Sequence, residues 1–252
     1  GLLCSLTLMW TGAYGKAFAL IEATRRLSAA QGVLPFSFLT LKNVEAMYYM
    51  LTAEREPCRK ASREGLEIAR TTGVNTWTFQ LLVYAYGSAL AGGELDVAAE
   101  VARELEPQLA GAGRFNLCLY HHFQAWEAML RKDLMRALQQ ERVALRMAIE
   151  VGCPFFEVLC RLALAEVLAE CGDERKCIAH LRQMRPIVES IDNRHLEFTC
   201  LIGFGRLALE HGRQRPGLNA LRRGLALGRE YGYAHFLWWR PSAIARVCAH
   251  AL

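Results

Sequence analysis

The sequence lacks the features that mark several common classes of protein. Its nine cysteines form no CxxC pair, which argues against a zinc ribbon or a thioredoxin-type redox motif. No Pro-, Gly- or Ser-rich linker interrupts the 252 residues, and no apolar N-terminal run with a basic flank predicts a signal peptide. We therefore expect one domain over residues 1–252, with cysteines buried as small hydrophobic side chains in a reducing cytoplasm.

Signatures of catalysis and of nucleotide binding are also missing. Neither HExxH nor GxSxG occurs, and Gly12-Ala-Tyr-Gly15-Lys16 has the wrong spacing for a P-loop and no Ser or Thr after it. Adjacent His121 and His122 lack the i, i+4 spacing with which two histidines on a helix share a metal. We expect no catalytic residues, no metal and no cofactor, and hence a protein that is not an enzyme.

Neither charge nor hydrophobicity is concentrated in one long run. The net charge is +5, and basic residues mostly alternate with acidic ones, as they do from Arg55 to Glu64. That pattern is typical of a solvated helix face and gives little support to nucleic-acid binding. The most apolar stretch, residues 74–93, is interrupted by Asn, Thr, Gln and Ser, which favours a buried helix. We expect neither a nucleic acid nor a membrane as a partner.

What the sequence does contain is a repeat. Polar breaks recur in two interleaved series, each with a spacing of about forty residues, which indicates pairs of helices joined by short turns. The predicted fold is all-α, an α-α superhelix (a TPR-like solenoid) of about six helix-pair repeats. The first series comprises Gly12, Thr52, Gly92, Lys132, Gly172 and His211, and the second comprises Gly32, Gly73, Gly113, Gly152, Asp192 and Gly232.

These breaks divide the chain into two alternating classes of helix. The first helices are predicted over residues 1–11, 35–52, 75–91, 114–131, 154–171, 194–211 and 235–250. The second helices are predicted over 14–30, 55–72, 94–111, 134–151, 174–191 and 214–231. Asp133 and Asp173 are placed to cap helices, Gly152 is placed to end one, and Pro107 and Pro186 should end or kink second helices.

The two classes of helix differ in composition. Of the 24 aromatic residues, all but Tyr14, Phe18, Tyr231 and Tyr233 fall in first helices, whereas second helices carry clusters of Arg, Lys and Glu. In solenoids of helix pairs the first helices line the concave wall. We therefore expect the binding surface on the first helices, and a solvated second-helix face that does not bind.

Alignment of the first helices on their terminal breaks separates packing positions from candidate binding positions. The position of His122 is occupied by Leu82, Leu162 and Ile202 in other repeats, so we expect a core histidine with a satisfied hydrogen bond. Another position is always small, Ala or Gly, and suits close helix crossing. Glu157 and Arg161 are spaced as an i, i+4 ion pair.

The remaining face of each first helix mixes aromatic, acidic, basic and imidazole groups at i, i+3, i+4 and i+7. Such a mixture suits a groove that binds a polar ligand with a flat or apolar part. In the alternative interpretation, the large aromatics only fill gaps between repeats. The candidate ligand- or partner-binding residues on the predicted concave face are Trp77, Tyr84, Tyr120, His121, Glu157 and Arg161.

A helix pair of about forty residues resembles the repeat region of MalT-like regulators, which are bacterial signal-transducing ATPases of the LuxR type. The segment Gly232-Tyr233 followed by Phe236 and Trp238-Trp239-Arg240-Pro241 is similar to one that closes the helical array in such regulators. The resemblance implies a sensor arm, with ATPase and DNA-binding modules elsewhere in a longer chain. Trp238, Trp239 and Arg240 are expected to cap the array or to dock another domain, although a stacking platform is an alternative.

Two functions follow from these patterns. The first is a ligand-sensing or protein-interaction domain of a cytoplasmic transcriptional regulator, in which an inducer shifts a two-state equilibrium by its differential affinity. The inducer is a small molecule or a protein bound on the concave face. The alternative is a free-standing TPR-type scaffold for protein–protein interaction with no role in transcription.

Overall fold

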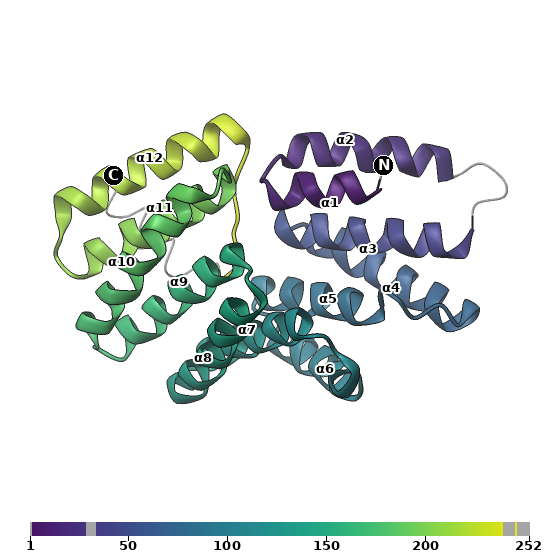
Figure 1. Cartoon of the computed structure of the whole chain (residues 1–252), viewed down its shortest axis with the longest axis horizontal. Helices are drawn as coiled ribbons and strands as arrows, with labels where there is room; N and C mark the ends of the chain where they lie inside the picture. The colour runs from purple at the N-terminus through teal and green to yellow at the C-terminus, as the bar shows by residue number, and fades with distance from the viewer. Residues whose placement is uncertain (1, 29–33, 239–244, 246–252) are drawn as a thin grey trace. The chain divides into compact units, whose positions relative to one another are not determined.

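The computed structural model describes residues 2–28, 34–238 and 245, and these residues form twelve α-helices and one short 3-10 helix (Figure 1). No strand occurs in these ranges. The prediction of an all-α fold built from helix pairs is confirmed. The helices are α1 (Leu2–Trp10), α2 (Tyr14–Ser28), α3 (Pro35–Leu51), α4 (Arg55–Thr72), α5 (Thr78–Gly92), α6 (Leu95–Leu105), η1 (Glu106–Gly111), α7 (Arg114–Leu130), α8 (Leu134–Val151), α9 (Pro154–Glu170), α10 (Glu174–Ser190), α11 (Arg194–Glu210) and α12 (Gln214–Tyr231).

The chain divides into two compact units, residues 1–116 and 117–252. In the first unit α1 packs on α2, α3 on α4 and α5 on α6, while the first helices α3 and α5 also contact each other. In the second unit α9 packs between α8 and α10, and α11 packs on α12. The expectation of one domain over the whole chain stays a prediction.

The helix boundaries follow from the capping residues. The Asp133 and Asp173 carboxylates accept hydrogen bonds from the backbone N–H groups of Arg136 and Lys176, as predicted. Gly152 ends α8 in the left-handed conformation, where a side chain would be strained.

The two prolines in second helices act differently. Pro107 lies in the first turn of η1, so the α-helical part of this predicted helix ends at Leu105. Pro186 lies inside α10, which continues to Ser190, so of the two predicted effects the end of the helix is wrong and the kink stays a prediction.

Burial separates the two classes of helix. In the second unit α9 buries 11 of its 17 residues and α11 buries 12 of 17, whereas α10 buries only 2 of 17. First helices are therefore packed on more than one side, and second helices present a wide face to solvent. The prediction of close helix crossing at small residues is confirmed at Gly205, where an added Cβ would lie 3.1 Å from the Gly217 carbonyl oxygen.

An extended segment follows α12, and we call residues Tyr233–Trp238 the C-terminal strap. All but Ala234 of its side chains are buried. The Tyr233 and Phe236 rings lie against Phe198 of α11, and the Trp238 ring stacks on Trp126 of α7 at a centroid distance of 6.5 Å. The predicted start of a helix at residue 235 is wrong, because residues 235–238 are not helical.

Two histidines are enclosed where the strap meets α11. The His195 Nε2–H donates to the His235 carbonyl oxygen at 2.8 Å, and the His195 ring lies edge-on to Tyr233. Burial lowers the pKa of each of these histidines from 6.5 to about 4, because the charged imidazolium has no water around it. Both rings are therefore neutral at neutral pH.

We predict that acid destabilises this unit through these histidines. As the pH falls from 6.5 towards 4, the unfolded chain binds a proton at each site that the folded chain does not, so the free energy of unfolding decreases. The limiting slope is about 1.4 kcal/mol per pH unit for each histidine. Urea denaturation between about pH 6.5 and 5, monitored by tryptophan fluorescence, measures this slope.

The His195→Phe variant removes one of the two titrating sites, so its slope should be smaller than that of the unsubstituted chain. Other titrating groups cancel in this difference. Phe236→Leu, which removes a ring packed on α11 without removing a titrating group, is the matched control and should leave the slope unchanged. Equal slopes for His195→Phe and the unsubstituted chain would contradict the assignment.

Candidate functional site

The predicted binding residues of the first unit lie at the start and in the middle of α5. Trp77, just before the helix, is half-buried, and its indole Nε1–H donates to Thr40 Oγ1 at 3.1 Å. Tyr84 is buried, and burial raises the pKa of its hydroxyl. Trp77 thus contacts the neighbouring first helix α3, and Tyr84 is part of the core. The role of both residues in binding stays a prediction.

The predicted residues of the second unit form two adjacent pairs on α7 and α9. The Tyr120 and His121 rings meet edge-to-face at 5.5 Å, and His121 Nδ1 lies 2.7 Å from Gln140 Oε1 on α8. The predicted ion pair of Arg161 with Glu157 is confirmed at 2.7 Å, and Arg161 also donates to a glutamine of α10. All four side chains are half-buried, so each keeps some surface for a partner.

Of the predicted C-terminal block, Trp238 lies in the strap, whereas Trp239 and Arg240 lie outside the described residues. The Trp238 ring covers His122 at a centroid distance of 5.5 Å as well as Trp126. Its φ of 69° places it in the left-handed region, which a bulky side chain rarely adopts. The packing of its indole on α7 therefore holds a conformation that the backbone alone disfavours.

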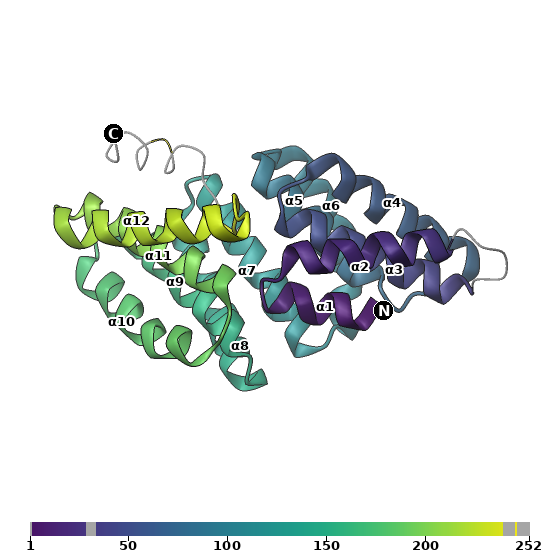
Figure 2. The ribbon, with the colours of Figure 1, turned by 90° about the horizontal axis from the view of Figure 1, so that it is seen from above.

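A groove of about 440 Å³ lies in the second unit between α10 and α12, and we call it the α10–α12 groove. Its floor is α11, which has α10 and α12 on opposite sides in both views (Figures 1 and 2). The groove exists because α10 packs on α9 and makes little contact with α11. The apolar lining consists of Ile178, Leu181, Met184 and Val188 of α10, Cys200, Leu201 and Phe204 of α11, and Pro216 and Ala220 of α12.

The floor of this groove occupies the helical positions from which the binding face was predicted. Glu197, Leu201 and Phe204 stand forty residues after Glu157, Arg161 and Leu164. The six residues predicted from sequence lie just before α5 and on α5, α7 and α9, and none of them lines this groove. The groove was not predicted because its walls are second helices, which were expected not to bind.

The rim of the groove is rich in arginine. Arg182 and Arg185 of α10 face Arg223 of α12 across it, and Arg213 stands at the entrance to α12. Helices α10 and α12 together carry eight Arg and Lys residues against three Glu. Their net charge of +5 equals that of the whole chain, so the excess positive charge is concentrated on these two helices.

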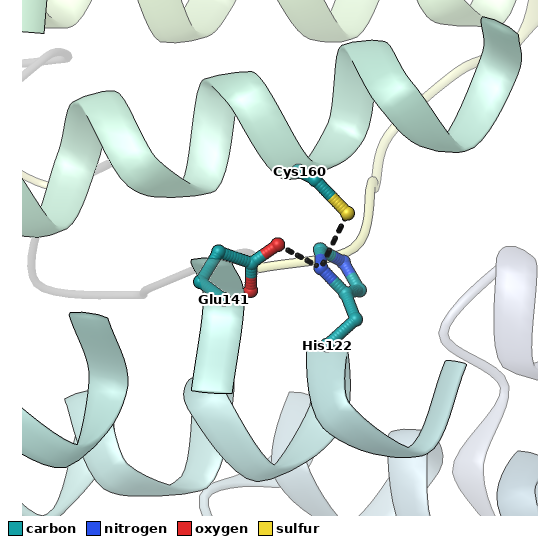
Figure 3. A group of neighbouring side chains, drawn as sticks. All are labelled: His122, Glu141 and Cys160. Carbon is teal, nitrogen blue, oxygen red and sulfur yellow. Dashed lines mark hydrogen bonds and ion pairs between the residues drawn. The ribbon is translucent and has the colours of Figure 1, made fainter. Parts of the chain in front are cut away.

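A buried polar cluster lies beneath Trp238, where side chains from three successive helices meet (Figure 3). His122 of α7 and Glu141 of α8 are 1% and 0% exposed, and His122 Nδ1 lies 2.8 Å from Glu141 Oε1. The Cys160 thiol of α9 lies 3.9 Å from the same nitrogen. The prediction of a core histidine is confirmed, and its Nδ1 has the expected hydrogen bond, whereas the buried His122 Nε2 and Glu141 Oε2 have no hydrogen-bond partner among the described residues.

Burial sets the charge state of this cluster. It raises the pKa of the Glu141 carboxyl, an effect that the neighbouring His122 opposes, and it raises the pKa of the Cys160 thiol well above its usual range. The thiol is therefore protonated and unreactive at neutral pH. Glu141 stands eight residues after the N-cap of its helix, and its charge is unusual for that position. The corresponding residues of the other second helices are uncharged: Ser62, Ala102, Leu181 and Leu221. This contrast could have identified Glu141 from the sequence.

The cluster offers three donor atoms of the kinds that bind zinc, all within 4.8 Å of one another. The separation of 2.8 Å between His122 Nδ1 and Glu141 Oε1 is that of a hydrogen bond. Two such ligands on one tetrahedral zinc would be about 3.3 Å apart, since each lies about 2.0–2.1 Å from the metal. Cys118 of α7 is a further neighbour of the Cys160 thiol, but the group whose donor atoms all lie within 4.8 Å of one another consists of His122, Glu141 and Cys160. The geometry fits a hydrogen-bonded core pair beside a thiol.

No known family matches the sequence, and no curated protein matches it. Among solved structures, the apo form of RapI is similar, with a TM-score of 0.62 and 13% sequence identity. The match covers 92% of this chain and 66% of the RapI chain, so this chain spans less than two thirds of that protein's length. At such low identity the likeness shows the helical-repeat fold alone.

We predict that His122 and Glu141 stabilise the fold only as a pair. His122→Leu leaves a carboxylate buried without its partner and should cost about 3–5 kcal/mol in the free energy of unfolding. Glu141→Leu leaves an unsatisfied imidazole. The double variant should lose clearly less than the sum of the single losses, because the following repeat has leucine at both equivalent positions, Leu162 and Leu181.

Urea denaturation of the two single variants and the double variant provides this thermodynamic cycle. The half-buried neighbour His121→Leu serves as the control and should change stability by about 1 kcal/mol or less. Strictly additive losses for His122 and Glu141 would show that the two side chains do not act together.

Proposed function

We propose that this chain is a non-enzymatic protein-interaction domain that senses a partner, and that the α10–α12 groove binds this partner. The observation that carries the proposal is the groove itself, an apolar floor framed by two helices and a charged rim. Apolar floors supply affinity, and polar groups around them fix orientation.

The titratable side chains that most resemble catalytic groups are engaged in holding the structure. His122 and Glu141 are bonded to each other in the core, and Arg161 is tied to Glu157. Because these groups are already bonded to one another, they favour a binding function over a catalytic one. No helix in the described ranges combines the length and the apolar character needed to span a bilayer.

The regulatory role comes from the sequence resemblance. We propose a sensor arm of a cytoplasmic MalT-like transcriptional regulator, in which binding of a protein or small-molecule inducer releases an autoinhibited ATPase. The ATPase and DNA-binding modules would lie elsewhere in the full-length chain, and a P-loop encoded upstream would support this role. The alternative is a free-standing scaffold with no role in transcription.

Site-specific photocrosslinking in cells tests the interaction function. A photoreactive amino acid at Leu201, on the groove floor, should give a discrete protein adduct that mass spectrometry identifies. The same amino acid at the exposed Met135 of α8 is the control. If Leu201 yields no protein adduct while a small metabolite raises the Tm of the purified chain, the partner is not a protein.

The six residues predicted from sequence remain a proposed contact surface: Trp77, Tyr84, Tyr120, His121, Glu157 and Arg161. We predict that Tyr120→Ala and Arg161→Ala each weaken binding of the crosslinked partner by at least tenfold, because truncation of an interface anchor commonly costs about 2 kcal/mol. Tyr120→Ala should not lower the Tm as a core truncation does, because the Tyr120 side chain is half-buried. Arg161→Ala should lower the Tm only slightly, through loss of the ion pair with Glu157.

Calorimetric titration of each variant beside a thermal melt measures the two effects. Phe123→Ala is the matched control, since Phe123 is an aromatic residue of the same helix but fully buried, and it should lower the Tm. Unchanged affinity, or a melting curve for Tyr120→Ala like that of Phe123→Ala, would assign these residues to packing.

A further inference from the structure

We infer that the partner presents an acidic amphipathic helix to the α10–α12 groove. This inference rests on the proposed interaction function and specifies the chemistry of the partner. Three properties of the groove lead to this inference. They are its length, the backbone hydrogen bonds of the lining helices, which are satisfied within each helix, and the positive charge on its rim.

The length suits about three turns of helix. The lining residues of α10 run from Ile178 to Glu189, a rise of about 16 Å at 1.5 Å per residue. On the floor, Leu201 and Phe204 are separated by i, i+3 spacing and lie on one side of α11. A partner helix with apolar residues at i, i+3 or i+4, and i+7 would place one on each turn of this floor.

The backbone of the groove excludes strand addition. All three elements that line the groove are α-helices, whose backbone N–H and C=O groups bond within the helix. A partner segment must therefore satisfy its own backbone hydrogen bonds before it enters an apolar floor. A helix does so, whereas an extended peptide would bury unsatisfied groups.

The charge of the rim selects an acidic partner. Arg182 has no ion-pair partner among the described residues, and Arg185 is paired only with the exposed Glu189 at 2.8 Å. Across the groove, Arg223 lies 3.5 Å from Glu197. Arg213 is paired with Glu174 at 3.2 Å. The groove lining nevertheless holds four arginines against two glutamates, Glu189 and Glu197, and carboxylates flanking an apolar stripe would pair with this excess of positive charge.

Two other occupants fit less well. A second copy of this chain that docked through its own α10 and α12 would bring helices of the same positive sign to the rim, and like charges repel. A nucleic acid would pair its phosphates with the arginines but would leave the apolar floor of Met184, Leu201 and Phe204 unused. An amphipathic helix uses both the floor and the rim.

A designed peptide pair tests the inference without knowledge of the natural partner. The first is a fluorescein-labelled peptide of about 16 residues with leucines at i, i+4 and i+7 and glutamates on the flanks, and the second carries lysines in place of the glutamates. Fluorescence anisotropy with the purified full chain should show at least tenfold tighter binding of the acidic peptide, and the difference should shrink in about 0.5 M salt.

Substitutions in the chain locate the binding. Arg182→Glu with Arg223→Glu should lower affinity for the acidic peptide at least tenfold and raise affinity for the lysine peptide. Leu201→Glu should weaken binding of both peptides. Arg146→Glu, an equally exposed arginine on α8 outside the groove, is the matched control and should leave affinity unchanged. Circular dichroism melts show whether each variant folds.

Each outcome decides the inference. Equal binding of the two peptides, no binding of the acidic peptide, or the same effect for Arg146→Glu as for the rim variant overturns it. If the peptide test fails but Leu201 still crosslinks to a protein in cells, the interaction function stands with a partner of different chemistry. If neither binds, both proposals fall.

Discussion

The close approach of neighbouring helices at small residues is the contact on which the rest of the structure depends. Gly205 of α11 meets Gly217 of α12, and Ala125 and Ala165 are fully buried on α7 and α9. Such crossings bring first helices into contact with neighbours on more than one side. Any polar side chain on these helices must then find its partner in the interior, because water is excluded.

The buried polar pairs follow from that constraint. His122 bonds to Glu141 in one repeat, and Arg206 bonds to Glu166 at 3.0 Å and to Glu210 in another. The His122–Glu141 and Arg206–Glu166 pairs each join two helices, whereas Arg206 and Glu210 both lie on α11. Each pair contributes to stability only while both partners are present. The buried carboxylates of Glu45 and Glu127 are likewise paired with basic side chains.

The repeat architecture could be predicted from the sequence, because turns and caps are local. A single Asp or Gly at a break decides where a helix begins or ends, and Asp133 and Gly152 do so as predicted. The strap could not be predicted in this way. A Gly-Tyr start followed by apolar residues is compatible with another helix, and only the buried surface of Phe198 and Trp126 selects the extended path.

The site was harder to predict for a similar reason. The spacing of Leu201 and Phe204 predicts that they share one face of the helix, and both line the groove, but the gap between α10 and α11 depends on packing over many residues. The concentration of arginine on α10 and α12 is visible in the sequence. The mild net charge of the whole chain does not reveal this concentration, because acidic and basic residues balance in the rest of the sequence.

The sparse packing of α10 has a consequence for the dynamics of the groove. This helix buries only Cys177 and Met184, whereas the floor helix α11 is buried along most of its length. Local opening of α10 therefore breaks few apolar contacts, and its amide protons should exchange with solvent sooner than those of α11. One wall of the groove is compliant while its floor is rigid. A surface of this kind adapts to side chains of different size, so discrimination between partners rests on charge more than on shape.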